Sequence, residues 1–336
     1  FQQKYKDAGQ TLLLNTWGKE LIQDKNGTVK GVVATNKNGD KITVNAKATI
    51  IATGGFFDNK EMREKYLRFP DADGLAQKGK TGDGIQMAWS AGGGKEGCEV
   101  QASYRPGPRG IGTTNHVSAT AKQPHLWLTP RGERFCDEKI MLEWPFAGNA
   151  LERIGGTMYV VYDQATLDHM EKDKGIDLGV GVMVPVGTKL TNFEKEWADA
   201  VKGGWAFKAD TLEGLAKATG MDPKKLEASV AGYNAVVEGK AKDPLGFVAN
   251  NKDDKTLTGG PWYACRKVPT VHHTMGGLEI NTKAQVIGVD GKVIPGLYAA
   301  GEVTGGIHGS NRLGGNAIAD VMVFGRTAGT NAATLK

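Results

Sequence analysis

Apolar runs near both ends of the chain predict β-strands. Near the start they cover residues 11–14, about 28–34 and 41–44, the last after the turn signal 38–40. The run 48–52 continues into Thr53-Gly54-Gly55, and a buried strand that ends in a small-residue turn is typical of a nucleotide-binding α/β layer. Towards the C-terminus strand signals return: apolar and polar residues alternate over 278–294, with a turn at 289–292, and an apolar strand follows in 296–301. Apolar residues over 316–330 then have helical spacing.

Between these strand-rich ends, from about residue 56 to 268, the pattern is helical and mixed. Asp210-Thr211 and Asp222-Pro223 are typical helix starts, because an oxygen-bearing side chain caps the first turn and proline suits its first position. The sequence therefore predicts an α/β protein. Its nucleotide-binding domain has two parts, residues 1–55 and 269–336, and residues 56–268 form an inserted α+β capping domain.

Composition and charge exclude several classes of function. The 42 basic and 37 acidic residues give a net charge of +5 without a basic run, which argues against nucleic-acid binding. The three cysteines form no CxxC pair, so neither a disulfide scaffold nor a metal site is expected. No apolar run approaches the roughly 20 residues of a membrane span. Many of the 48 glycines are clustered, which indicates backbone packed close to a ligand or in tight turns.

The most informative block runs from residue 271 to 324. It contains His272-His273-Thr274-Met275-Gly276-Gly277 and, later, a glycine-rich stretch with Glu302, Arg312 and Asn316. A flavin that donates hydride needs a cation to hold an acceptor carboxylate and backbone donors near its ring. Paired histidines and one arginine in a glycine-rich frame provide these groups. A helix beginning near Asn316 would direct its N-terminal amides at the anionic edge of a reduced flavin.

This block resembles the C-terminal part of the soluble fumarate reductase and flavocytochrome c family, which includes urocanate reductases. The segments 294–302, 52–56 and 82–84 match the family as well. The resemblance implies an FAD-binding α/β fold with an inserted cap, and an oxidoreductase that reduces a carbon–carbon double bond. It also suggests a periplasmic or extracytoplasmic location, which the residues themselves leave open.

The resemblance implies a role for individual residues. His272 and Arg312 would clamp a substrate carboxylate, near the amide of Gly315. His273 would contact the flavin and Glu302 its ribityl chain. The other implied FAD contacts are Asp83, Thr53, Gly54, Gly301, Ala317 and Ile318. For His116, His125, His169 and His308, packing or surface roles are expected.

The first departure from the family pattern concerns the proton donor. Family reductases carry an arginine acid shortly after an Arg-Phe-x-Asn-Glu stretch, and a gapless comparison from Arg134 places Leu142 at that position. An apolar side chain cannot be a general acid. The remaining candidates for the donor are Glu143, Tyr104 and Arg105, with Lys139 if the loop is shifted.

The second departure lies in residues 101–106. Fumarate reductases place a histidine there for the far carboxylate, whereas Ser103 or Tyr104 stands there in this chain, and Val117-Ser118 replaces a nearby Thr-Glu pair. A tyrosine resembles the urocanate branch, in which an aromatic ring replaces the second carboxylate. An aryl- or alkyl-acrylate is therefore expected to fit better than fumarate, unless Tyr104 and Trp127 are only packing residues.

No Gly-x-Gly-x-x-Gly turn of the kind that holds the ADP half of FAD stands at the start of this sequence. We expect that half of the site from a segment before residue 1 or from another chain, and an electron donor, haem or flavin, from outside this chain. Two alternatives remain open. One is a flavin dehydrogenase resembling ketosteroid dehydrogenases, which the His272-His273 pair disfavours. The other is a non-catalytic flavin electron carrier.

Overall fold

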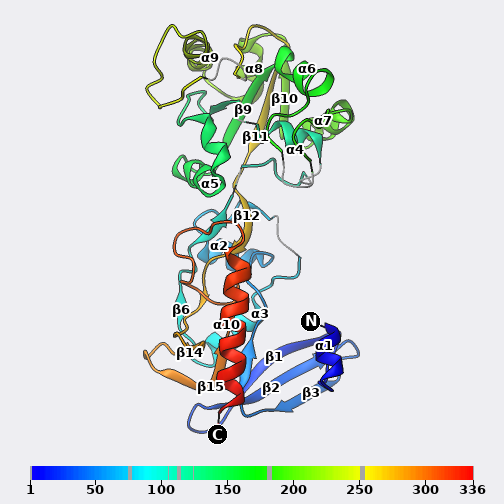
Figure 1. Ribbon diagram of the computed structural model, residues 1–336, viewed down its shortest axis with the longest axis vertical. Coiled ribbons are helices and arrows are strands. Elements are labelled where there is room, and N and C mark those ends of the chain that lie inside the picture. Colours follow the sequence, from blue (N-terminus) through cyan, green and yellow to red (C-terminus); the bar gives the residue numbers. More distant parts are fainter. Residues whose placement is uncertain are drawn as a thin grey trace. The chain divides into compact units, whose positions relative to one another are not determined.

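The computed structural model describes residues 2–74, 78–104, 106–111, 115–123, 125–179, 184–249 and 254–335, without the side chain of Trp144. The chain forms two compact units (Figure 1). The first comprises Phe1–Pro70, Gln77–Ala102 and His273–Lys336, and the second Asp71–Ala76 and Ser103–His272. The first unit thus includes residues 56–70 and 78–102, which lie within the predicted capping domain of residues 56–268.

An antiparallel meander of three strands begins the first unit, after the short helix α1 (Gln2–Asp7). Its strands are β1 (Thr16–Gln23), β2 (Val29–Asn36) and β3 (Lys41–Asn45). The predicted β2 and β3 are confirmed, but the strand predicted at 11–14 is wrong. The carboxylate of Asp24 accepts the amides of Asn26 and Thr28 and so fixes the hairpin. Pairing from that turn reaches Thr16 opposite Asn36, where β2 ends, so residues 11–14 have no partner strand.

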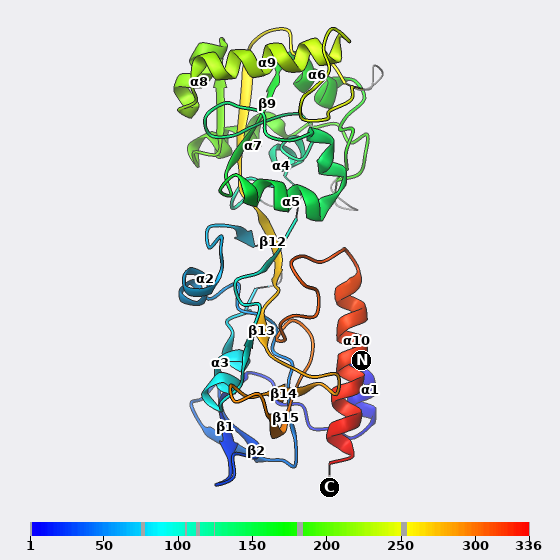
Figure 2. The same cartoon turned by 90° about the vertical axis from the view of Figure 1, so that its left-hand side faces the viewer.

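A second sheet of the first unit has the order β14-β15-β4. Strands β14 (Gln285–Ile287) and β15 (Val293–Ala299) are antiparallel, and β4 (Thr49–Ile51) runs parallel to β15. Helix α10 (Asn316–Ala333) packs beside this sheet, with Ala328 buried against Tyr298 and Ala300 (Figure 2). The parallel β4–β15 pair followed by α10 confirms the α/β layer predicted from the two ends of the sequence.

Shorter elements complete the first unit and connect it to the rest of the chain. They are α2 (Lys60–Tyr66), α3 (Asp83–Ser90) and the two-stranded pair β6 (Lys95–Glu96) and β13 (Gly277–Leu278). A three-stranded sheet has the order β5-β12-β7, formed by β5 (Asp73–Gly74), β12 (Thr270–Thr274) and β7 (Gln101–Ser103).

The second unit is built on an antiparallel sheet of order β10-β11-β9-β8. Its strands are β8 (Leu126–Leu128), β9 (Met158–Asp163), β10 (Ala206–Ala209) and β11 (Trp262–Lys267). The helices are α4 (His116–Thr120), the 3-10 helix η1 (Glu138–Leu142), α5 (Trp144–Arg153), α6 (Gln164–Lys172), α7 (Phe193–Lys202), α8 (Leu212–Thr219) and α9 (Pro223–Val237).

Both faces of this sheet are buried. Val160 and Tyr162 of β9 pack in one apolar cluster with α4 to α7, whereas Tyr159 and Val161 pack in another with α8 and α9. The predicted helix starts are confirmed, because Thr211 and Asp222 cap α8 and α9 through their side-chain oxygens. In the described part of the chain, no helix is long and apolar enough to cross a membrane.

Candidate active site

Two glycine turns of the first unit pack directly on each other. The amide of Gly82 donates to the carbonyl of Gly55 at 3.1 Å. A Cβ on Gly84 would overlap Thr53 Oγ1, and a Cβ on Gly55 would overlap Thr274 Oγ1 and lie 2.6 Å from Glu302 Oε1. The close approach of these four chain segments therefore requires glycine at positions 55 and 84.

A pocket of about 530 Å³ opens beside these turns. Four of the residues predicted to contact FAD, Thr53, Gly54, Gly301 and Glu302, line it together. The other lining residues are Ala52, Lys78, Gly79, Lys80, Ala300, Val321 and Gly325. Gly54 and Gly301 have φ of +78° and +80°, a conformation that favours glycine. The pocket wall is therefore largely backbone and small side chains, which allows a flat ligand to approach closely.

A carboxylate and an ammonium meet at this pocket. Lys80 Nζ donates to the carboxylate of Glu302, and the amide of Thr274 donates to the same side chain at 3.3 Å. Burial raises the pKa of Glu302, and the hydrogen bond and charge of Lys80 oppose that shift. Ionised Glu302 thus depends on Lys80 for its stability.

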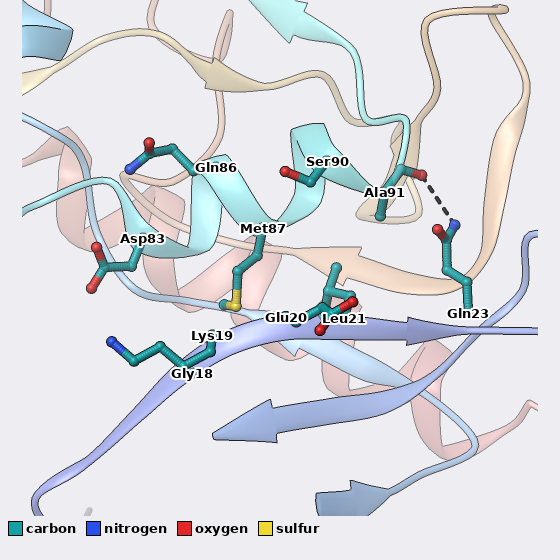
Figure 3. Close-up of a pocket in the computed structure, with 10 residues that line it drawn as sticks. All are labelled: Gly18, Lys19, Glu20, Leu21, Gln23, Asp83, Gln86, Met87, Ser90 and Ala91. Atoms are coloured by element: carbon teal, nitrogen blue, oxygen red, sulfur yellow. Dashed lines mark hydrogen bonds between the residues drawn. The ribbon is translucent and has the colours of Figure 1, made fainter. Parts of the chain in front are cut away.

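Asp83 does not line this pocket. It lies at the N-terminal end of α3 and faces a separate pocket of about 510 Å³ between α3 and β1 (Figure 3). Met87 of α3 approaches Gly18 of β1 there, since a Cβ on Gly18 would lie 3.1 Å from Met87 Cε. The role of Asp83 as a flavin contact stays a prediction.

Arg312 is only 8% exposed and has two side-chain contacts within its own unit. Its Nε donates to His273 Nδ1 at 3.3 Å, and its Nη1 donates to the carbonyl of Leu313 at 3.1 Å. The ring of His273 lies 5.9 Å, between centroids, from that of His308, whose Nε2 is 3.3 Å from Asp320 Oδ2. The structure thus brings the predicted residues Arg312 and His273 together.

His272 belongs to the second unit, where its partner is Tyr104. The two rings have centroids 4.3 Å apart, and Tyr104 is 4% exposed. The amide of Tyr104 donates to the carbonyl of Thr270, and the neighbouring Ser103 hydroxyl donates to the carboxylate of Glu152 on α5. The segment that departs from the family pattern is therefore firmly seated next to His272.

Leu142, at the position of the family's arginine acid, and the other donor candidates differ in exposure. Leu142 ends η1 with 55% of its surface exposed, and the adjacent Glu143 is exposed as well. Lys139 forms an ion pair of 3.0 Å with Asp254. Arg105 lies outside the described residues. Of the candidates in the described part of the chain, Tyr104 alone is buried beside a predicted substrate-binding residue.

The N-terminus of α10 begins at Gly315, whose φ is +87°. No atom lies within 4 Å of the position of a Cβ on Gly315, Ala317 is half-buried and Ile318 is 68% exposed. The first amides of α10 therefore border open space, where the positive end of the helix dipole favours an anionic group.

Sequence motifs did not indicate Lys80 or Asp320. Lys80 and Glu302 are 222 residues apart, so no local pattern connects them. His308 was expected to have a packing or surface role. Asp320 carried a usable signal, because it is an acid within the apolar run 317–324 of a helix and is 9% exposed.

Comparison with known proteins identifies the class. The family model for the FAD binding domain matches residues 1–318. The chain is 38% identical to a fumarate reductase (cytochrome) of Shewanella frigidimarina, over 96% of this chain and 52% of that protein. It is 31% identical to a vinyl phenol reductase of Lactiplantibacillus plantarum, over 99% of this chain and 70% of that protein.

A solved structure shows the same likeness. The open conformation of a flavocytochrome c3 fumarate reductase has a TM-score of 0.65 and 32% identity, over 99% of this chain and 54% of that one. The chain belongs to the FAD-binding flavoprotein family that contains these reductases, and its cofactor is FAD. It spans about half the length of the fumarate reductase that it matches.

The residues present suit the isoalloxazine and ribityl part of FAD. The glycine-lined pocket, the Glu302–Lys80 pair and the open N-terminus of α10 provide close backbone approach, polar partners and an anion site.

Proposed function

We propose that this chain forms the flavin-ring and substrate part of an FAD-dependent reductase of α,β-unsaturated carboxylates. Its acceptor is an aryl- or alkyl-acrylate rather than fumarate. The observation that carries the proposal is the buried Tyr104, whose ring lies 4.3 Å from that of His272. An aromatic side chain beside the carboxylate-binding histidine suits an apolar or aromatic substituent and offers no cation to a second carboxylate.

In this reaction the acceptor gains two electrons and two protons. FAD supplies a hydride to the β-carbon when it is bound and reduced. His272 and Arg312 bind the carboxylate, which polarises the double bond and lets negative charge develop on the α-carbon side. An acid then protonates the α-carbon. Among Glu143, Tyr104 and Arg105, we favour Tyr104, because its phenol is buried beside His272.

The electron donor in this proposal is a haem or flavin module outside the chain. The relative from Shewanella frigidimarina is named as a cytochrome enzyme, which supports a haem donor for that protein. For the present chain, any donor of sufficiently low potential that reduces the flavin would serve.

The test is anaerobic oxidation of reduced methyl viologen by the flavin-loaded protein with fumarate, urocanate, cinnamate and acrylate in turn. We expect turnover with cinnamate or acrylate and little with fumarate. Flavin reduction without turnover of any alkene would instead indicate an electron carrier, and oxidation of a 3-ketosteroid would indicate a dehydrogenase.

A pair of variants tests the specificity. Tyr104→His restores the residue type that the family uses for a far carboxylate, so its relative kcat/KM for fumarate should rise at least about tenfold. Tyr104→Phe is the matched control, because like Tyr104→His it lacks the phenol favoured above as the acid, but it adds no cation. If Tyr104→His and the native protein share the same ranking of acceptors, Tyr104 does not select the substrate.

A further inference from the structure

Three buried polar side chains and the half-buried His308 form a series in the first unit that ends at Arg312. In order they are Asp320, His308, His273 and Arg312. The successive separations are 3.3 Å between Asp320 Oδ2 and His308 Nε2, 5.9 Å between the two imidazole centroids, and 3.3 Å between His273 Nδ1 and Arg312 Nε. All four belong to the segment 273–336 of a single compact unit.

Hydrogen bonding determines the form of His273. Because Nε of Arg312 is a donor, Nδ1 of His273 must accept, and a neutral His273 then carries its proton on Nε2. A second guanidinium nitrogen, Nη1, is fixed by the carbonyl of Leu313. Both of these contacts of the Arg312 side chain are with groups of its own unit.

The carboxylates around Arg312 explain why such a series is useful. Burial raises the pKa of Asp320 and of Glu302, and the guanidinium opposes the shift in both. Among the described residues, His308 contacts Asp320, Lys80 contacts Glu302 and His273 contacts Arg312. Both acids attract the guanidinium of Arg312, so a hydrogen-bond acceptor at a fixed position is needed to hold it in one orientation.

A purely structural role explains the His308–Asp320 pair less well. Both side chains are largely buried, at 14% and 6% exposure. In many proteins the free-energy cost of removing such a pair from water exceeds the attraction between its two members. Apolar side chains would pack α10 at least as well. The pair is placed where it borders the histidine that contacts Arg312.

We propose that His308 and Asp320 are positioning residues that hold Arg312, through His273, in the orientation that binds the substrate carboxylate. Asp320 fixes the His308 imidazole, His308 restricts the ring of His273, and His273 accepts from Arg312. This inference rests on the proposed function only for the identity of the ligand, a carboxylate.

Equilibrium binding tests it without requiring turnover. Flavin-loaded protein is titrated with 3-phenylpropionate, a saturated monocarboxylate, and with its neutral amide, while the flavin absorbance is followed. In Asp320→Asn and His308→Gln the Kd for the carboxylate should rise about tenfold, with the flavin content and the Kd for the amide unchanged. Asp320→Glu should recover most of the affinity.

The second unit offers a matched control. His169 lies between Asp173 and Asp177, at 3.3 and 3.2 Å, away from any predicted site residue in sequence. Asp173→Asn should leave both Kd values unchanged. The inference is overturned if Asp320→Asn and His308→Gln bind the carboxylate like the native protein, or if they lose carboxylate and amide to the same extent. Failure of the native protein to reduce any enoate would instead contradict the proposed function.

Discussion

The guanidinium of Arg312 donates a hydrogen bond of 3.3 Å to the imidazole of His273, a residue 39 positions earlier in the chain. The first residue was predicted to bind substrate and the second to contact the flavin. Their direct contact means that the orientation of the substrate cation and that of a cofactor-side histidine are not independent. A change at His273 should therefore also alter the binding of the substrate carboxylate by Arg312.

Replacement of Arg312 separates catalysis from cofactor binding. In Arg312→Ala the carboxylate loses its fixed cation, so kcat/KM with an enoate should fall at least about 100-fold. The flavin content should stay nearly unchanged, because Arg312 does not line the pocket at Glu302. Arg326→Ala, at an exposed position of α10, is the control. Loss of flavin from Arg312→Ala would make Arg312 a structural residue.

Gly55 provides a test of the cofactor pocket. A Cβ at this position would overlap Thr274 Oγ1 and lie 2.6 Å from Glu302 Oε1. Gly55→Ala should destabilise the fold by about 2 kcal/mol and lower the flavin content, because Glu302 must move. Gly232→Ala is the control, since no atom lies within 4 Å of its added Cβ and alanine favours the helix α9. Equal flavin contents in the two variants would show that Gly55 does not shape the pocket.

Local patterns in the sequence were sufficient for some elements. The run 48–52 with its glycine turn predicted β4, and Asp222-Pro223 predicted the start of α9, because each signal lies within a few residues. The strand predicted at 11–14 failed, since the turn at Asp24 sets the pairing of β1 and β2 from the other end. A short apolar run such as 158–163, buried on both faces, is not distinguishable by periodicity from a buried helix.

The candidate site shows the same limit. Motifs indicated His273, Glu302 and Arg312 as candidates, because they lie in one glycine-rich block. They could not identify Lys80 or Asp320, whose importance comes from tertiary contacts with Glu302 and His308. Charge compensation in a buried site is a property of the fold and not of sequence spacing.

The Lys80–Glu302 pair predicts a pH dependence of stability. Burial raises the pKa of Glu302 in the folded chain above the ordinary value of 4.5. The folded state therefore binds this proton more tightly than the unfolded state. The resulting stabilisation is complete below about pH 4.5 and is lost as the pH rises through the folded pKa. The free energy of unfolding of the native chain, measured relative to that of Glu302→Gln, should therefore decrease as the pH rises over this interval.

Removal of Lys80 makes this effect larger. Lys80→Met leaves the carboxylate of Glu302 without its counter-charge, so the pKa of Glu302 should rise further. The free energy of unfolding should fall by about 3 kcal/mol at neutral pH. The double variant Lys80→Met/Glu302→Gln should recover much of that loss. Urea unfolding at pH 4 and pH 7 gives both values. Additive losses in the double variant would show that the two side chains are not coupled.

The Leu142 position tests the gapless comparison that left the proton donor unidentified. Leu142 ends η1 and is 55% exposed, so Leu142→Arg should change the free energy of unfolding by no more than about 0.5 kcal/mol. If this position is equivalent to the arginine acid of family reductases, the added guanidinium should change kcat for at least one acceptor about tenfold or more. Val186→Arg, at an exposed apolar residue of the same unit, is the control.

The measurement is reduced-viologen oxidation with fumarate, urocanate, cinnamate and acrylate. An unchanged kcat and acceptor range would mean that the comparison is misaligned at residue 142 and that the acid must be sought in another segment.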